Sequence, residues 1–311
     1  MMTSNFIENK KNTRVTFVGH VNHGKSTILG HLLHNINYTT DREIEKTKNW
    51  SGVMDENEDE IETGNTHCFK EVEVYHGENI ITFIDTPGHK NLIQEMIYGA
   101  NSADLGLMIM SLKPGDFESG LKGQTMEHLQ LLRSFGICNI VVIFNKLDLI
   151  NWDLQIIEEY KNKFLKKIQP IKFKSVDFCC VSGVTGENLT DEKKGFGPCL
   201  IDRIVKYEKR EPIQKIEIKA DSIVCKIMIL DSFTSIISQG FKCIMHSGSD
   251  IFDIEIVKVK VIKKNGETKK IGIAGECALV KISFDTRNKH VYKNIVLRRD
   301  DMTIAFGVVN L

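Results

Sequence analysis

The sequence predicts a doubly wound α/β domain followed by a single antiparallel β-barrel, and three observations support this prediction. Short, nearly all-apolar runs alternate with segments of helical periodicity as far as about residue 206, as in a parallel sheet covered by helices. The charged segment 206–215 contains a proline and suits a linker. Beyond it the helical periodicity is lost, and runs of alternating apolar residues remain, which is typical of an antiparallel barrel.

The expected domain boundaries follow from these changes of pattern. We expect a disordered tail over 1–12, the α/β domain over 13–206, a linker over 207–218 and the barrel over 219–311. Within the barrel, Asn265–Gly266 is expected to form a hairpin turn, because both residues accept the positive φ angles that such turns require.

Each element of the α/β domain is predicted from its own pattern. Continuous apolar runs predict buried strands, and apolar residues at every third or fourth position predict helices. The segments CFKEVEVY and NIITFID flank His76–Gly77 and predict a hairpin. The expected strands cover 14–19, 105–112, 139–145 and 177–183, and the expected helices cover STILGHLLHNI, 123–135 and 151–168.

The composition excludes several classes of protein. The 41 Lys and Arg balance 41 Asp and Glu in 311 residues, so no overall charge attracts the chain to nucleic acid or membranes. No apolar run approaches the length of a membrane span, and the polar N-terminus lacks a signal-peptide core, so we expect a cytosolic protein without a membrane partner. The eight cysteines include no CxxC pair, and the adjacent Cys179 and Cys180 suit buried, reduced thiols.

A glycine-containing loop lies between the first expected strand and the first expected helix. Its sequence, GHVNHGKS at 19–26, matches the P-loop pattern G-x-x-x-x-G-K-[ST]. In such a loop, backbone N–H groups and the positive end of the helix face phosphate oxygens. We expect Lys25 to hold the β- and γ-phosphates and the Ser26 hydroxyl to bind Mg²⁺. The expected phosphate-binding residues are Gly19, His20, Val21, Asn22, His23, Gly24, Lys25, Ser26 and Thr27.

A second motif, DTPGH at 85–89, follows the strand-forming run IITFI. A carboxylate at the end of a strand beside the P-loop is well placed for a Mg²⁺-linked role, which we assign to Asp85. The N–H group of Gly88 is expected to reach the γ-phosphate. Alone, an acid and a glycine at this spacing would indicate only a turn, but after a P-loop they indicate a nucleoside triphosphate site.

A third motif, NKLD, ends the apolar strand NIVVIFN. The Asp148 carboxylate can accept both N–H donors of the guanine Watson–Crick edge, whereas adenine offers no such pair. We expect Asn145 to brace the loop and reach the base, and the Lys146 stem to lie over its face. The backbone N–H groups of Ser182 and Gly183, after the strand DFCCV, can reach guanine O6. The three motifs together predict GTP and GDP as ligands, with Mg²⁺.

Nearly the whole chain, about 14–311, resembles the translational GTPases of the elongation factor 1-alpha class. The resemblance rests on GHVNHGKSTILGHLL, DTPGHKNLIQEMIYGANSADLGLMIM, FESGLKGQTMEHLQLLRSFGICNIVVIFNKLD and VSGVTGENL. It implies a GTP hydrolase in which Lys25 is one catalytic residue. It also implies that Thr66, in a first switch region, closes over Mg²⁺ and the γ-phosphate, and that His89 positions the hydrolytic water. The implied Mg²⁺ ligands are Ser26, Thr66 and Asp85.

The sequence departs from this class near the nucleotide. Asn22 stands where the class usually has aspartate, Thr63 where it has arginine, and Asn65 where it has a hydrophobic residue. Asn22 keeps a carbonyl oxygen but loses the charge beside the phosphates. We therefore expect slow hydrolysis by the protein alone and activation by the ribosome.

The class carries two barrels after its GTPase domain, whereas this chain has room for one. The segments GFKCIMHSGSDIFDIEIVKVKVI, IAGECALVKISF and VLRRDDMTIAFGVV resemble the last barrel. No segment resembles the middle barrel, which in the elongation factor helps to hold aminoacyl-tRNA. The resemblance therefore favours a monomer that binds the ribosome and, through its barrel, a tRNA-shaped protein partner.

Two branches of the class have such a partner. One is the Hbs-type GTPase, which works with pelota in rescue of stalled ribosomes and mRNA surveillance, and the other is the class II release factor of termination. Four segments are slightly more similar to the rescue branch: FESGLKGQT, SFGICNIVV, Asn151–Trp152 and VLRRDDMTIA. One segment, VSGVTGENL, is more similar to the termination branch. Of the two branches we favour rescue, with termination as the alternative. A non-hydrolysing GTP-binding adaptor and an aminoacyl-tRNA carrier are less favoured, and the absence of a middle barrel argues against the carrier.

Overall fold

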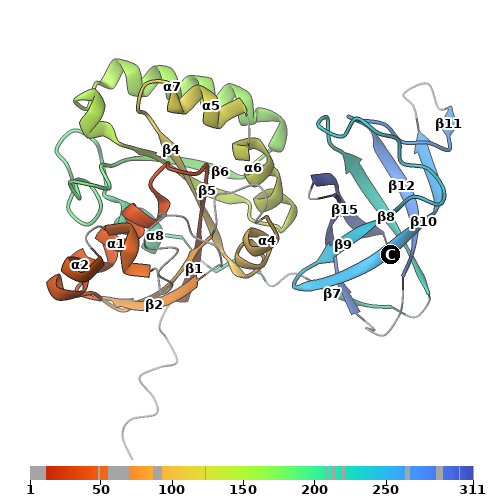
Figure 1. Ribbon diagram of the computed structural model, residues 1–311, viewed down its shortest axis with the longest axis horizontal. Coiled ribbons are helices and arrows are strands. Elements are labelled where there is room, and N and C mark those ends of the chain that lie inside the picture. Colours follow the sequence, from red (N-terminus) through yellow and green to blue (C-terminus); the bar gives the residue numbers. More distant parts are fainter. Residues whose placement is uncertain are drawn as a thin grey trace, which may run out of the picture. The chain divides into compact units, whose positions relative to one another are not determined.

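The computed structural model describes residues 12–47, 50–54, 70–86, 93–122, 124–207, 209–211, 214–218, 221–262, 267–284, 290–300 and 302–310. The chain divides into two compact units, of which the first lies within the residues up to Arg210 and the second is formed mainly by the residues from Glu211 onward (Figure 1). The predicted combination of a doubly wound α/β domain and one antiparallel barrel is confirmed.

The first unit is built on a six-stranded sheet with the order β2-β3-β1-β4-β5-β6. Only β2 runs antiparallel to its neighbour, β3, with which it forms the predicted hairpin. Every residue of β4 and all but the first of β5 are buried, which explains their uninterrupted apolar sequences. The strands are β1 (Asn12–Gly19), β2 (Lys70–His76), β3 (Asn79–Asp85), β4 (Leu105–Ser111), β5 (Asn139–Asn145) and β6 (Ser175–Cys180).

Helices cover both faces of this sheet (Figure 1). On one face, Leu29 of α1 and Leu200 of α8 share a core with Phe17 of β1. On the other face, the ring of Phe117 in α5 lies 6.3 Å from that of Phe144 in β5. The helices, with 3₁₀ helices written η, are α1 (Lys25–Asn35), α2 (Asp41–Thr47), η1 (Trp50–Met54), α4 (Ile93–Ser102), α5 (Asp116–Lys122), α6 (Gln124–Ser134), η3 (Leu147–Ile150), α7 (Leu154–Ile168), η4 (Gln169–Ile171) and α8 (Leu200–Val205).

Helix α7 begins three residues later than the periodicity predicts. Asn151 and Trp152 have φ angles of 50° and 56°, which are left-handed and not helical. The Asp153 side chain then accepts hydrogen bonds from the N–H groups of Gln155 and Ile156, at 2.8 and 3.2 Å, and caps the helix. The turn before the cap thus sets the direction in which the chain leaves β5.

The parallel strands end at one edge of the sheet. The last residues of β1, β3 and β5 are Gly19, Asp85 and Asn145, and each belongs to one of the three sequence motifs. Because the carboxyl ends of parallel strands form the binding edge of doubly wound sheets, the topology brings these motifs together.

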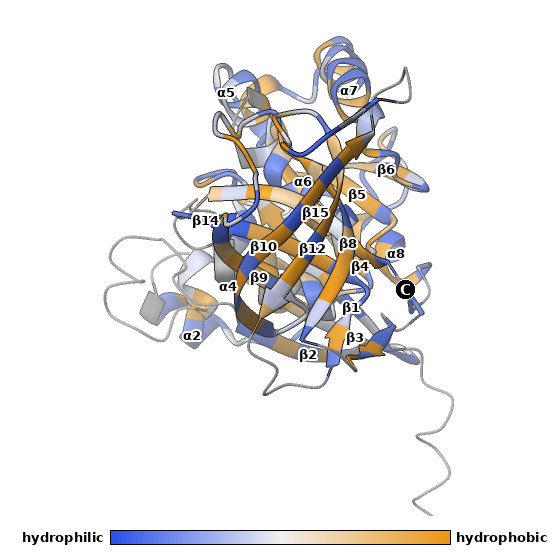
Figure 2. Cartoon of the chain, turned by 90° about the vertical axis from the view of Figure 1, so that its right-hand side faces the viewer, coloured by the Kyte–Doolittle hydropathy of each residue, from blue (hydrophilic) through white to orange (hydrophobic). Residues whose placement is uncertain are grey.

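The second unit is a closed antiparallel barrel. Its strands follow the order β10-β12-β8-β15-β14-β9, and β9 pairs again with β10 to close the ring. Residues alternate between buried and exposed along β8 and β12, and Figure 2 shows apolar and polar bands along the strands of the barrel. The strands are β7 (Lys215–Glu217), β8 (Ser222–Ile229), β9 (Lys242–Ser247), β10 (Asp250–Ile262), β11 (Thr268–Lys269), β12 (Cys277–Phe284), β13 (His290–Tyr292), β14 (Asn294–Arg299) and β15 (Met302–Asn310).

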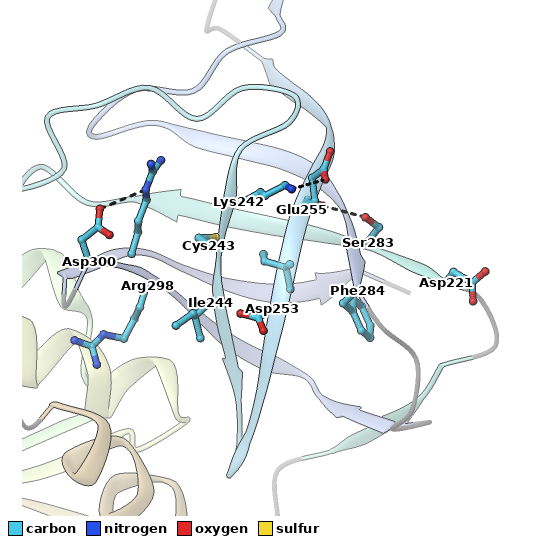
Figure 3. A pocket seen from close by; sticks show the side chains of 12 residues that line it. Asp221, Lys242, Cys243, Ile244, Asp253, Glu255, Ser283, Phe284, Arg298 and Asp300 are labelled. Atoms are coloured by element: carbon cyan, nitrogen blue, oxygen red, sulfur yellow. Dashed lines mark hydrogen bonds and ion pairs between the residues drawn. The ribbon is translucent and has the colours of Figure 1, made fainter.

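The barrel carries a pocket of about 710 Å³ (Figure 3). The apolar side chain of Phe284 lines it together with charged groups. Lys242 pairs with Glu255 at 3.9 Å, and Arg299 pairs with Asp300 at 3.4 Å. Charges of opposite sign therefore lie side by side around this pocket.

Several local features differ from the predictions or lie beyond them. The expected linker contains the strand β7, which pairs with β13. Strands β10 and β11 pair antiparallel, but the turn expected at Asn265–Gly266 lies outside the described residues. The described cysteines are free thiols; Cys179 is buried as predicted, whereas Cys180 is only half-buried. None of the described helices has the length and apolar character needed to span a bilayer.

Candidate nucleotide-binding site

The P-loop passes from β1 into α1 through residues with left-handed backbone angles. Gly24, the residue before α1, has a φ angle of 93°, and a Cβ atom there would overlap the Asn145 side chain. A Cβ atom on Gly19 would lie 2.5 Å from the carbonyl oxygen of Ile109. Asn22 has a φ angle of 61°, which asparagine tolerates better than most residues. The two glycines and Asn22 thus let the loop curl over the end of β1.

Lys25 lies inside the curl of this loop. Its Nζ atom donates hydrogen bonds to the carbonyl oxygens of Gly19 and His20, both at 3.2 Å. Burial lowers the pKa of Lys25 to about 8, although the nearby Asp85 carboxylate acts in the opposite direction. A polyphosphate held in the loop would meet this ammonium group and the N-terminus of α1 together.

Ser26 and Asp85 form a compact pair of oxygen donors. The Ser26 hydroxyl donates to Asp85 Oδ2 at 3.0 Å, and Asp85 is fully buried. Burial raises the pKa of Asp85, while Lys25 and the Ser26 hydroxyl lower it. Hard oxygen ligands from one hydroxyl and one carboxylate fit Mg²⁺, which takes its remaining ligands from phosphates and water. The described residues contain no cluster of three or more His, Cys, Asp or Glu side chains able to hold a metal.

Asn145 joins the P-loop to the loop that follows β6. Its Nδ2 atom donates to the carbonyl oxygen of His23 at 2.9 Å, and its Oδ1 atom accepts from the N–H group of Gly183 at 2.9 Å. The residue is only 2% exposed. The structure thus shows the bracing part of the predicted role of Asn145.

Asp148 and Ser182 meet where the base-reading residues are expected. The Ser182 hydroxyl donates to Asp148 Oδ1 at 2.6 Å. The N–H groups of Ser182 and Gly183 already donate to Glu187 O and Asn145 Oδ1. The next N–H group, that of Val184, has no acceptor among the described residues, and its side chain is exposed. Val184 is therefore an additional donor candidate for guanine O6 that the motif alone did not identify.

Lys146 connects the NKLD motif to the P-loop. Its φ angle is 66°, and its Nζ atom donates to the carbonyl oxygen of Asn22 at 2.7 Å and to Asp116 Oδ2 at 3.1 Å. Asp116 also accepts from the Ser111 hydroxyl at 2.7 Å. Burial alone would raise the pKa of Asp116, but hydrogen bonds from Ser111 and Lys146 hold it below its usual value.

Asp116 belongs to α5, which sequence reasoning missed together with its contacts. His23 of the P-loop packs against this helix: a Cβ atom on Gly120 would lie 2.5 Å from His23 Cε1. Burial lowers the pKa of His23 to about 4, so the ring is neutral, and its Nδ1 atom lies 3.2 Å from the Ile109 carbonyl oxygen. The signal in the sequence was an acid shortly after a buried strand, in LKPGD.

The structure brings together predicted site residues from all three motifs, among the residues that it describes. Hydrogen bonds connect the P-loop to Asp85 at the end of β3 and to Asn145 of the NKLD motif. Further hydrogen bonds connect the NKLD motif to Ser182 and Gly183. Five residues named in the sequence analysis lie outside the described residues: Gly88, His89, Thr66, and the two that differ from the class, Thr63 and Asn65.

This sheet topology and this loop define a P-loop nucleotide-binding domain. The family model "Elongation factor Tu GTP binding domain" matches residues 10–237. The chain therefore belongs to the family of the elongation factor Tu GTP-binding domain.

Individual relatives agree with this family. The chain is 34% identical over 226 residues to elongation factor 1-alpha of Caldivirga maquilingensis, which covers 66% of this chain and 51% of the relative. It is 36% identical over 208 residues to protein HBS1 of Drosophila melanogaster, which covers 62% of this chain and 31% of the relative. The chain thus spans about half, or less, of the length of these relatives.

A solved structure shows the same fold. The GTP-bound GTPase-like domain of S. cerevisiae Ski7 superimposes with a TM-score of 0.76 at 14% sequence identity. The superposition covers 100% of this chain and 99% of that structure.

Replacing Gly120 with alanine tests the packing of α5 on the P-loop. Helix propensity alone would make Gly120→Ala stabilising by about 1 kcal/mol. Because the new methyl group would overlap the buried His23 ring, we expect a net loss of about 1–2 kcal/mol of unfolding free energy and faster nucleotide release. Both tryptophans, Trp50 and Trp152, lie in the first unit, so their fluorescence during urea unfolding measures its stability.

The matched control is Ser119→Ala, an exposed position on the same helix, which should change stability by less than about 0.5 kcal/mol. Equal stability of Gly120→Ala and the wild type would contradict the packing described for His23.

The buried amine of Lys25 predicts a rise of stability with pH. Its pKa is about 8 in the folded protein and near its ordinary 10.5 in the unfolded chain, so the unfolded chain binds more protons between these values. Without nucleotide, the wild type should therefore gain about 1.4 kcal/mol relative to Lys25→Met between pH 7 and pH 9. Tryptophan-detected urea unfolding of both proteins at the two pH values measures this, and parallel pH profiles would refute it.

Proposed function

We propose that the protein is a GTP hydrolase that acts on the ribosome with a tRNA-shaped protein partner. The observation that carries this proposal is the continuous set of hydrogen bonds from Asp148 and Ser182, through Gly183 and Asn145, to the P-loop. A base-reading carboxylate and a phosphate-binding loop in one rigid group suit a guanine nucleotide. Membership of the elongation factor Tu GTP-binding family supports the same ligand.

In this proposal each part of the site has a separate task. Lys25 and the N-terminus of α1 neutralise the β- and γ-phosphates. Ser26 and Asp85 would hold Mg²⁺, which would neutralise the charge that develops between the phosphates during cleavage. Through the resemblance to translational GTPases, Thr66 closes the site over the γ-phosphate and His89 orients the attacking water.

The proposed partner binds through the barrel. Pelota-like and release-factor-like proteins are the two candidates, and we favour the pelota-like partner and rescue of stalled ribosomes, with mRNA surveillance, over termination. The similarity to protein HBS1 of Drosophila melanogaster supports this choice, although elongation factor 1-alpha sequences are about equally similar. We further propose that the protein works as a monomer in the cytosol.

The base specificity tests the nucleotide part of the proposal. Asp148→Asn replaces a carboxylate acceptor with an amide that can donate to a 2-oxo group, so preference should move from guanine to xanthine nucleotides. We expect GDP affinity to fall by about a hundredfold or more, and XDP to become the better ligand. Competition with a fluorescent nucleotide measures both affinities. A variant that keeps its guanine preference, or a wild type that prefers ADP, would contradict a GTP-specific site.

The catalytic part is tested by single-turnover GTP hydrolysis with ribosomes. His89→Ala should reduce the ribosome-stimulated rate by at least about a hundredfold, because the attacking water loses its orienting group. His76→Ala, at the β2–β3 hairpin, is the matched control and should react like the wild type. Parallel reactions with a pelota-like protein and with a release factor show which partner stimulates hydrolysis. Equal rates for His89→Ala and the wild type would refute the assigned role.

A second candidate function is a GTP-binding adaptor that does not hydrolyse its nucleotide. The observation that favours it is Asn22, which keeps a carbonyl oxygen beside the phosphates but lacks the charge of the aspartate that is usual in the class. In the same hydrolysis experiment, an adaptor would bind GTP tightly and show no stimulation by ribosomes with either partner.

A further inference from the structure

The loop after Ser182 contacts Asp148, the carboxylate proposed above to bind guanine. Backbone hydrogen bonds close this loop: Gly186 N–H donates to Ser182 O at 2.8 Å, and Ser182 N–H donates to Glu187 O at 3.2 Å. The Ser182 hydroxyl accepts from Thr185 N–H at 3.3 Å and donates to Asp148 at 2.6 Å. Any movement of the loop therefore moves the hydroxyl that orients Asp148.

Glu187 is the outer anchor of this loop. Its Oε1 atom accepts from Lys193 Nζ at 2.5 Å, and its Oε2 atom accepts from the Thr185 hydroxyl at 2.9 Å. The hydrogen bond from Lys193 is the main cause of the lowered pKa of Glu187, and the hydrogen bond from the Thr185 hydroxyl adds to it. Glu187 is thus an ionised carboxylate that accepts hydrogen bonds from two side chains, those of Lys193 and Thr185.

Lys193 reaches Glu187 from a fixed position. Its backbone N–H group donates to Asn188 Oδ1 at 2.9 Å, and the buried Asn188 donates to the Cys180 carbonyl oxygen, at the end of β6, at 2.8 Å. The ammonium group lies 4.5 Å from the centre of the Trp152 ring, within the range of a cation–π interaction. These contacts leave the Lys193 side chain little freedom.

Trp152 connects this cluster to the segment that carries Asp148. Its backbone N–H group donates to Leu147 O at 3.0 Å, in the left-handed turn directly after η3. Its ring packs edge-on against Phe196, with ring centres 4.8 Å apart. The tryptophan of the Asn151–Trp152 pair therefore links the segment after β5 to the loop after β6.

We propose that Trp152, Glu187 and Lys193 are positioning residues for guanine recognition. Together they hold the Ser182–Glu187 loop at a fixed place relative to Asp148, and they act through Ser182 and Thr185. This inference rests on the proposed guanine site and adds residues that lie outside its sequence motifs. The cluster sets how strongly the protein prefers guanine over other bases.

The test compares two probes, GDP and the diphosphate of 2-aminopurine riboside, which lacks O6 and the N1 hydrogen. Lys193→Ala should raise the Kd for GDP by about tenfold and reduce the preference for GDP over the analogue by a similar factor, because a charge-assisted hydrogen bond is lost. Lys193→Arg keeps the cation and a donor and should restore both values to within about twofold of the wild type.

The chain offers a closely matched control. Lys269 and Glu276 of the barrel form an ion pair of 2.6 Å, and their side chains are 22% and 26% exposed. The ion pair of Lys193 and Glu187 is similar: its length is 2.5 Å, and the side chains are 29% and 38% exposed. Lys269→Ala should leave the affinity for both probes unchanged. Any loss of selectivity in Lys193→Ala is then specific to the loop.

Trp152→Asn is the second variant, because asparagine tolerates the left-handed backbone while the indole is removed. It should lower guanine preference in the same direction as Lys193→Ala. If the wild type is guanine-selective and both variants keep this selectivity, even with a lower Tm, the positioning role is overturned and the proposed function stands. A wild type without guanine preference overturns both.

Discussion

The two hydrogen bonds of the Asn145 side chain are the interaction on which the rest of the site depends. They join the carbonyl group of His23 in the P-loop to the N–H group of Gly183 after β6, and the amide is almost fully buried. A buried amide group without partners costs about 1–3 kcal/mol, so this geometry is strongly preferred. Glycine at position 24 follows from it, because any side chain there would overlap the Asn145 amide. The parallel sheet makes the contact possible by ending β1, β5 and β6 at one edge.

At the phosphate end of the site, burial destabilises the charged forms of two side chains, and a bound ligand would stabilise them. Burial disfavours the charged forms of both Lys25 and Asp85, and each stabilises the charge of the other. A polyphosphate beside Lys25 and a divalent cation beside Asp85 would favour both charged forms. Buried groups of this kind occur most often at functional sites, which agrees with the position of this pair at the binding edge.

Local sequence patterns predicted most of the fold. The runs in β4 and β5 are apolar throughout because both faces of these strands are covered by helices. The motifs were also recognisable, because a phosphate-binding loop needs glycines and a lysine at fixed spacing along one segment. Helix α5 was missed: its DFESGLK sequence follows a Pro–Gly turn, has seven residues and contains a glycine, so it carries little periodicity. The late start of α7 was missed because the left-handed angles of Asn151 and Trp152 leave no clear pattern.

By itself, the sequence determined the fold class, the three nucleotide motifs and the residues Lys25, Ser26, Asp85 and Asp148 within them. The tertiary structure decided which partners hold those residues in place. Asp116 meets Lys146 from thirty positions away, and Ser182 meets Asp148 from thirty-four. Such contacts join segments whose distance depends on strand order and loop path, and local periodicity carries no information about either. For the same reason, the cluster of Trp152, Glu187 and Lys193 became visible only when the loops after β5 and β6 were placed side by side.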